Sequence, residues 1–179
     1  LKVGGVVGPM TTDGTTQTFT IALAGEWDYD TAVTAIGLVN DCDTDSTNDA
    51  TFSHIEIYSL APTQAPTTTL SPTPSHYGLD LGEDEFVSWS WGGGDQDVDS
   101  DWTLTAHDTG VELGGNTGLA IELSSPITID DSSYLKFDFE QNDECEIHAI
   151  ALLADGATGT YGETYGDYTI WQLSGTQVW

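Results

Sequence analysis

The chain has 179 residues, of which 38% are hydrophobic, and its 2 basic residues stand against 30 acidic residues, so the formal net charge is −28. The hydrophobic content excludes a disordered acidic tail. The scarcity of Lys and Arg excludes nucleic acid and anionic membranes as partners, because both are bound through basic side chains.

Segments in which apolar and polar residues alternate recur along the chain, whereas few stretches have the i, i+3, i+4 spacing of a helix. Such alternation is typical of half-buried strands, and loops rich in Gly, Asp, Asn and Ser separate the segments. We therefore predict an all-β fold, an antiparallel β-sandwich of the jelly-roll kind. The predicted strands, in chain order, are Thr18–Leu23, His54–Tyr58, Phe86–Trp91, Trp102–Ala106, Gly118–Leu123, Tyr134–Phe139, Ile147–Leu153 and Tyr168–Leu173.

Residues 61–75 are rich in Pro and Thr and are predicted to form a linker. Such a composition favours an extended, polyproline-like segment that can carry O-glycans. The predicted glycan carriers are Thr67, Thr68, Thr69 and Thr73. On this division, residues 1–60 and residues 76–179 are separate units.

An internal repeat lies across this linker. Three early segments align with three late ones: Thr18–Ile21 with Lys136–Phe139, Thr34–Asp41 with His148–Asp155, and Phe52–Ile57 with Tyr168–Leu173. Residues 1–60 then correspond to the C-terminal half of a unit that residues 76–179 contain almost whole. Half a sandwich has unpaired edges. We therefore expect its strands to be completed from outside residues 1–60, with another copy of the chain favoured over residues 76–179.

The two cysteines, Cys42 and Cys145, fit either one disulfide or two free thiols. Neither lies in a zinc-binding pattern. We favour the disulfide, because we expect the chain to be secreted.

Two loops carry aspartates at alternate positions, a pattern that can supply oxygen ligands to Ca²⁺. The spacing starts like that of an EF-hand, but the glycine and the final glutamate of that loop are missing. The hypothesis is a calcium ion at one or both loops, and the alternative is that the loops are simply hydrated. The candidate ligands are Asp95, Asp97, Asp99 and Asp101 in one loop and Asp41, Asp43 and Asp45 in the other.

Trp89 and Trp91 are two residues apart on a predicted strand, so both side chains point to one face. If exposed, the pair suits stacking on sugar rings, and if inward-facing it belongs to the core. Trp102 and Trp171 are candidates of the same kind.

No residues are predicted to be catalytic. His148 lies within the apolar segment Ile147–Leu153 and is interpreted as a hydrogen-bonded structural residue. No G-x-S-x-G nucleophile elbow occurs. No apolar run approaches the ~18 residues that a membrane helix needs, so no membrane insertion is expected.

Residues 77–179 resemble a family of carbohydrate-binding-module-like β-sandwich domains that are appended to secreted enzymes and surface proteins. The resemblance rests on Ser88–Asp97, Val111–Thr117, Tyr134–Phe139, Glu144–Ile150 and the closing Leu173–Trp179. It implies an extracellular, non-catalytic module that binds polysaccharide or attaches to a matrix. The alternative hypothesis is a structural subunit of an extracellular filament, sheath or adhesive layer, assembled by strand exchange between copies of the chain.

Overall fold

The structure, a computed structural model, describes residues 2–3, 13–25, 32–42, 49–59, 76–79, 85–88, 102–105, 109–154 and 168–175. Every regular element in these ranges is a β-strand, from β1 to β12. Nothing in the described ranges is a helix long and apolar enough to cross a membrane. The predicted all-β sandwich of antiparallel sheets is confirmed.

Sheet A has its long strands in the middle and its shortest strands at the edges. Neighbouring strands are antiparallel, except for the parallel pair of β1 and β12. The order across the sheet is β1 (Lys2–Val3), β12 (Tyr168–Ser174), β11 (Ile147–Ala154), β3 (Val33–Asp41), β9 (Thr117–Ile127) and β6 (Glu85–Ser88).

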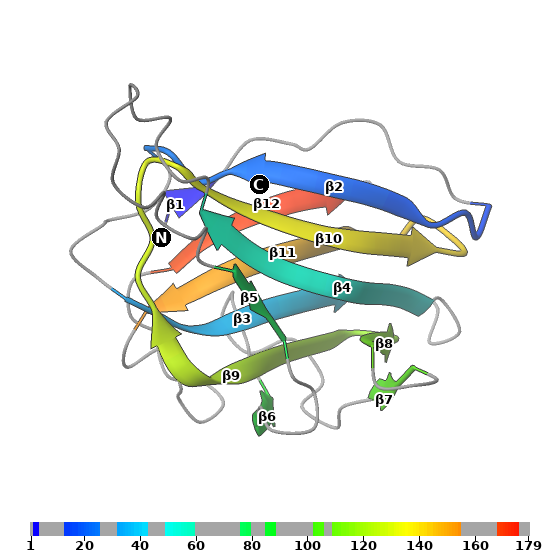
Figure 1. Cartoon of the computed structure of the whole chain (residues 1–179). Helices are drawn as coiled ribbons and strands as arrows, with labels where there is room; N and C mark the ends of the chain where they lie inside the picture. The colour runs from blue at the N-terminus through cyan, green and yellow to red at the C-terminus, as the bar shows by residue number, and fades with distance from the viewer. Residues whose placement is uncertain are drawn as a thin grey trace, which may run out of the picture.

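Sheet B is antiparallel throughout and packs against sheet A (Figure 1). In this sheet β4 (Asp49–Ser59) pairs on one side with β8 over its first half and with β5 over its second half. The order across the sheet is β2 (Gln17–Ala22), β10 (Ser133–Gln141), β4 (Asp49–Ser59), β8 (Gly110–Gly114) and β7 (Trp102–Leu104), with β5 (His76–Gly78) beside β4.

The main core lies between the two sheets and contains large apolar side chains from both. On the sheet B side, Phe19 stacks on Phe137 with ring centroids 5.6 Å apart, and Phe52 meets Phe139 edge to face at 4.9 Å. These aromatic pairs join three neighbouring strands, β2, β10 and β4. Burial of aromatic area on this scale is the main force that holds the layers together.

Sheet A is buried on both faces. Ile150 and Leu152 of β11 belong to the main core, whereas Ile147 and Leu153 belong to a second apolar cluster with Val39. Because side chains alternate along a strand, the second cluster lies on the other face of the sheet. All eight residues of β11 are buried, which explains why this strand reads as a continuous apolar run.

The sequence places Phe137, Phe139, Ile147 and Ile150 in the core, on one face of neighbouring strands, and their burial is confirmed at 0%, 1%, 8% and 0% exposure. The predicted position of all four residues on one face of neighbouring strands is wrong. β10 and β11 belong to different sheets and face each other across the sandwich, and Ile147 points to the opposite face of sheet A from Ile150.

The strands of residues 17–59 find their partners outside that segment, as the sequence predicts, and the partners belong to the same chain. β2 pairs with β10, β3 lies between β11 and β9, and β4 lies between β10 and β8. No second copy is needed to complete them, although the sequence favoured one.

In two of the three repeat alignments, the early segment and the late segment are paired strands of one sheet. Phe19 is directly opposite Phe137, and Gly37 is directly opposite Ala151, which are the residues that the repeat aligns. The third alignment has no such counterpart, because β4 belongs to sheet B and β12 to sheet A. The division of the chain into separate units at residues 61–75 stays a prediction.

The disulfide between Cys42 and Cys145 is confirmed. Both residues are 5% exposed. Cys42 directly follows β3 and Cys145 lies just before β11, and the backbone N–H of Glu146 donates to the Asp41 carbonyl at 2.9 Å beside them. A buried disulfide is consistent with an oxidising compartment outside the cytosol.

The Pro/Thr-rich segment joins two strands that are neighbours. β4 and β5, which flank it, pair antiparallel with Tyr58 opposite His76. Both ends of the segment are therefore fixed side by side in sheet B.

Replacing residues 60–75 by an Asn-Gly turn about a quarter as long should raise the free energy of unfolding by about 1 kcal/mol, because each halving of a closed loop lowers its entropic cost by about 0.6 kcal/mol. Urea denaturation measures the change. A Gly/Ser segment of the original length is the control and should leave stability unchanged. A large loss of stability in both variants would mean that residues 60–75 contribute native contacts.

Candidate functional site

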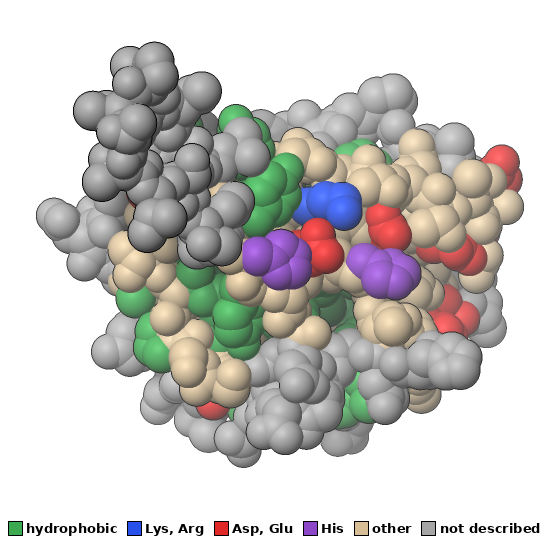
Figure 2. Space-filling model, in the orientation of Figure 1, with side chains coloured by type: hydrophobic (Ala, Val, Ile, Leu, Met, Phe, Trp, Pro, Cys, Tyr) green, Lys and Arg blue, Asp and Glu red, His purple; other side chains and the backbone are tan. Residues whose placement is uncertain are grey.

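The outer face of sheet B carries polar and charged side chains, and we call it the polar sheet face. It is formed by the outward residues of β2, β10, β4 and β5. Along β10 the burial alternates strictly, with Leu135, Phe137 and Phe139 inward and the even-numbered residues between them outward. Figure 2 shows histidine, acidic and basic side chains gathered near the middle of this face.

A β-bulge places one of these histidines. Lys136 pairs with Glu56, but Asp138 pairs with Ser53, so Phe137 faces two residues of β4 instead of one. His54 occupies the extra position with a φ of 49°, a left-handed conformation that is uncommon outside glycine. Its N–H donates to the Thr109 carbonyl at 3.0 Å. The bulge therefore turns Ser53 and His54 outward in succession.

Gly110 makes this arrangement possible on the other side of β4. A Cβ atom at Gly110 would lie 2.5 Å from the carbonyl oxygen of Phe52 and 2.5 Å from the Cβ of Ser53. The backbone of β8 can approach β4 this closely only without a side chain.

The charged groups of the polar sheet face form two short networks. In one, Glu56 accepts from Lys136 Nζ at 3.3 Å, and its other oxygen lies 3.5 Å from His76 Nε2. In the other, Asp138 lies 3.0 Å from His54 Nδ1 and accepts from the Thr18 hydroxyl at 2.5 Å. These contacts fix donors and acceptors in place on an open, solvent-facing surface.

An aromatic pair borders the first network. Tyr58 and Tyr134 are cross-strand partners, with ring centroids 5.5 Å apart and an interplanar angle of 14°. Both are half-buried. Stacked rings of this kind offer a flat apolar surface next to fixed hydrogen-bonding groups.

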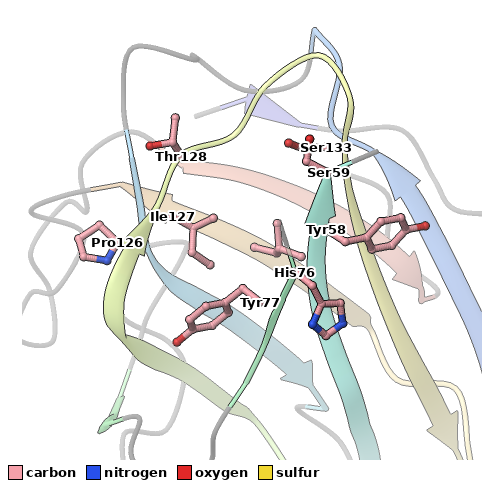
Figure 3. A pocket seen from close by; sticks show the side chains of 9 residues that line it. Tyr58, Ser59, His76, Tyr77, Pro126, Ile127, Thr128 and Ser133 are labelled. Carbon is pink, nitrogen blue, oxygen red and sulfur yellow. The ribbon is translucent and has the colours of Figure 1, made fainter. Parts of the chain in front are cut away.

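A pocket of about 390 Å³ opens beside Tyr58, and we call it the end pocket. It lies where β4 ends, between β5 and the stretch that runs from the end of β9 to the start of β10 (Figure 3). Its lining residues are Ile57, Tyr58, Ser59, His76, Tyr77, Pro126, Ile127, Thr128 and Ser133.

Asp130 organises the turn at the rim of this pocket. Its carboxylate accepts from the Ser132 hydroxyl at 2.7 Å, from the Ser133 hydroxyl at 3.0 Å and from the Ser59 hydroxyl at 3.1 Å. The hydrogen bond from the Ser132 side chain is the main cause that holds the pKa of Asp130 below its ordinary value, and partial desolvation opposes it. An ionised carboxylate therefore stands at the rim at neutral pH.

His148 is buried and hydrogen-bonded, as the sequence predicts. It is 0% exposed, its Nε2 lies 3.4 Å from the N–H of Cys145, and its ring meets Phe139 edge to face at 5.5 Å. Burial lowers the pKa of His148 to about 4, while a hydrogen bond with the Asp143 backbone acts in the opposite direction. The imidazole is therefore neutral at physiological pH and is enclosed in the sandwich.

Two of the predicted sugar-binding tryptophans lie in the described part of the chain. Trp171 is 2% exposed and belongs to the core, so its indole is not available to a sugar, and this prediction is corrected. Trp102 is half-buried and stacks on Phe86, with ring centroids 4.8 Å apart. Trp89 and Trp91 lie outside the described residues.

The calcium hypothesis stays a prediction. Among the described residues, no three His, Cys, Asp or Glu side chains come together in a way that could hold a metal ion. Asp41, the one predicted ligand that is described, is 9% exposed at the end of β3. The remaining predicted ligands, Asp43, Asp45, Asp95, Asp97, Asp99 and Asp101, and the predicted glycan carriers, Thr67, Thr68, Thr69 and Thr73, lie outside the described residues.

Sequence reasoning missed the tyrosine pair and the histidines of the polar sheet face. Tyr58 lies one residue after an inward isoleucine, Ile57, and Tyr134 lies one residue before an inward leucine, Leu135. Both tyrosines therefore have the outward parity of their strands. This outward parity is the signal in the sequence that points to the two tyrosines.

Comparison with protein-family models, with curated proteins and with solved structures finds no match. The resemblance to carbohydrate-binding modules therefore stays a prediction. The fold and the chemistry of the site are the only guides to function.

Proposed function

We propose that this chain is a non-catalytic extracellular module that binds neutral polysaccharide across the polar sheet face. The observation that carries the proposal is the stacked pair of Tyr58 and Tyr134, which lies half-exposed beside the Glu56 and Lys136 ion pair.

The two parts of this surface suit the two parts of a sugar. The C–H faces of a pyranose ring are apolar and pack on an aromatic ring, and its hydroxyl groups need hydrogen-bond partners. His54, Asp138 and Glu56 already have their side chains fixed by neighbours, so little side-chain entropy is lost when a sugar hydroxyl joins them.

Charge favours a neutral polymer. With a net charge of −28, the chain repels polysaccharides that carry uronate or sulfate groups. The single lysine of the polar sheet face is paired with Glu56 and does not provide a free cationic site.

Replacing Tyr134 by alanine should weaken polysaccharide binding about tenfold, which corresponds to about 1.4 kcal/mol, because the ligand loses one ring of its stacking surface. Titration calorimetry with soluble neutral polysaccharides (β-1,3-glucan, β-1,4-xylan, β-1,4-mannan and amylose) measures the change. Tyr134→Phe keeps the ring and should bind nearly as the wild type does.

Thr103→Ala is the matched control, because Thr103 is exposed on β7 at the far edge of sheet B from β10. It should bind as the wild type does. Equal affinity of Tyr134→Ala and wild type, or no binding of any of these polymers by the wild type, would contradict the proposal.

A further inference from the structure

The end pocket is closed on its inner side. Ile57 and Ser133, which line it, are 4% and 2% exposed, and Ile57 belongs to the main core. A polymer can lie across an open sheet face with both ends free, whereas a sugar ring that enters this pocket from the polar sheet face meets a floor, which suits the last ring of a chain.

The walls of the pocket combine the apolar side chains of Ile57, Pro126 and Ile127 with polar side chains and aromatic rings. The Tyr77 ring and the Ile127 side chain lie between β5 and β9 (Figure 3), and both pack against the main core. The Tyr77 hydroxyl lies 3.4 Å from the Ser124 hydroxyl, and the hydroxyls of Ser59 and Ser133 are directed to Asp130. This arrangement suits a sugar ring that presents an apolar face inward and hydroxyl groups outward.

The pocket is continuous with the polar sheet face. Tyr58 lines the pocket and also stacks on Tyr134, and His76 lines the pocket and also contacts Glu56. A sugar in the pocket and a sugar on the tyrosine pair would therefore be near neighbours. The carboxylate of Asp130, which accepts from Ser59 and Ser133, and that of Glu56, which contacts His76, disfavour an anionic sugar at this position.

We propose that the end pocket binds the terminal ring of a neutral polysaccharide whose next rings lie on Tyr58 and Tyr134, so that the module recognises chain ends. This inference rests on the proposed function of the polar sheet face. It adds a specificity that an open face alone does not provide.

The number of binding sites per gram of sugar tests the inference. A neutral polymer that binds the wild type is partly hydrolysed with acid, which multiplies its ends without changing its mass. Titration calorimetry on the two preparations should give a number of sites per gram that rises in proportion to the ends. An unchanged number of sites per gram would overturn end recognition and leave polysaccharide binding intact.

Thr128→Trp supplies a second test, because Thr128 is exposed at the mouth of the pocket and a larger side chain there blocks entry without entering the core. This variant should lose at least about tenfold in affinity for the hydrolysed polymer. Ser125→Trp adds the same bulk at an exposed residue of β9 that does not line the pocket, and it should bind as the wild type does.

The outcomes separate the two proposals. Wild-type affinity in Thr128→Trp, together with weaker binding by Tyr134→Ala, would overturn end recognition alone. Failure of every polymer to bind the wild type would overturn both.

Discussion

Replacing Cys42 and Cys145 together by alanine is expected to lower the free energy of unfolding by about 4 kcal/mol. The bond links residues 103 positions apart, and closing a loop of that length removes about 4.7 kcal/mol of unfolded-chain entropy in the loop-closure treatment, while measured losses are typically about 2–5 kcal/mol. The loss is a large fraction of the stability of an ordinary domain.

The native arrangement around the bond should survive its removal. β3 and β11 are already paired over their whole length, with Asp41 opposite Ile147 at the end where the cysteines lie. Both cysteines are 5% exposed, and alanine fits the space they occupy. The substitution therefore acts mainly by raising the conformational entropy of the unfolded chain.

Guanidinium denaturation of the oxidised wild type, the reduced wild type and the double variant measures the effect. The two forms without the bond should share one lowered midpoint, and adding reductant to the double variant should change nothing. An oxidised wild type that unfolds at the same midpoint as the double variant would show that the bond does not stabilise the sandwich.

The alternation of apolar residues made the strands predictable. The segment Tyr134–Phe139 lies inside β10, and the segment Thr18–Leu23 is displaced from β2 by one residue toward the C-terminus. What alternation cannot provide is the sheet to which each strand belongs, because an inward face looks the same from either layer. The sequence therefore put Phe139 and Ile150 on neighbouring strands, whereas they belong to different sheets and contribute to the same core from opposite sides.

The internal repeat indicated that the strands of residues 1–60 need partners outside that segment, but it did not indicate whether those partners belong to the same chain. The alignment of Phe19 with Phe137 shows only that two segments are alike, and like segments can pair within a chain or between chains. Pairing within one chain avoids the association of two molecules that each carry a net charge of −28. Electrostatic repulsion therefore favours pairing within one chain over pairing between two copies.

The candidate site was harder to predict because it depends on a bulge. His54 faces Asp138 only because one extra residue in β4 shifts the alternation, and a strict period of two would place Ser53 and His54 on opposite faces. The end pocket is assembled from three separated stretches, around residues 57–59, 76–77 and 126–133, and no local pattern links them.

The stability of the protein should fall by about 3 kcal/mol as the pH is lowered from about 6.5 to about 4, because of His148. Burial lowers the pKa of His148 in the folded protein to about 4 from an ordinary 6.5. As the pH falls through this window, His148 binds a proton in the unfolded chain but not in the folded protein. Each unit of difference between its two pKa values corresponds to about 1.36 kcal/mol of stability. The contribution is fully present above about pH 6.5 and is lost toward pH 4.

Other groups must be separated from this effect. The pKa of Asp130 is lowered from 3.8, so its stabilising contribution is lost only at a still lower pH. Repulsion among the 30 acidic residues of the chain also affects stability, and it is common to all the variants. A difference between two variants cancels these shared terms.

Unfolding free energies of His148→Asn and His54→Asn, measured by urea denaturation from pH 7 to pH 4.5 at constant ionic strength, isolate the buried histidine. His54 is a matched control because its side chain is 59% exposed on the polar sheet face. The His148 variant should have a flatter profile than the His54 variant, whatever its absolute stability. Should His148→Asn fail to fold, an NMR titration of the His148 ring in the wild type gives its pKa directly. Parallel profiles for the two variants, or a His148 resonance that titrates near pH 6.5, would contradict the assignment of a buried, neutral imidazole.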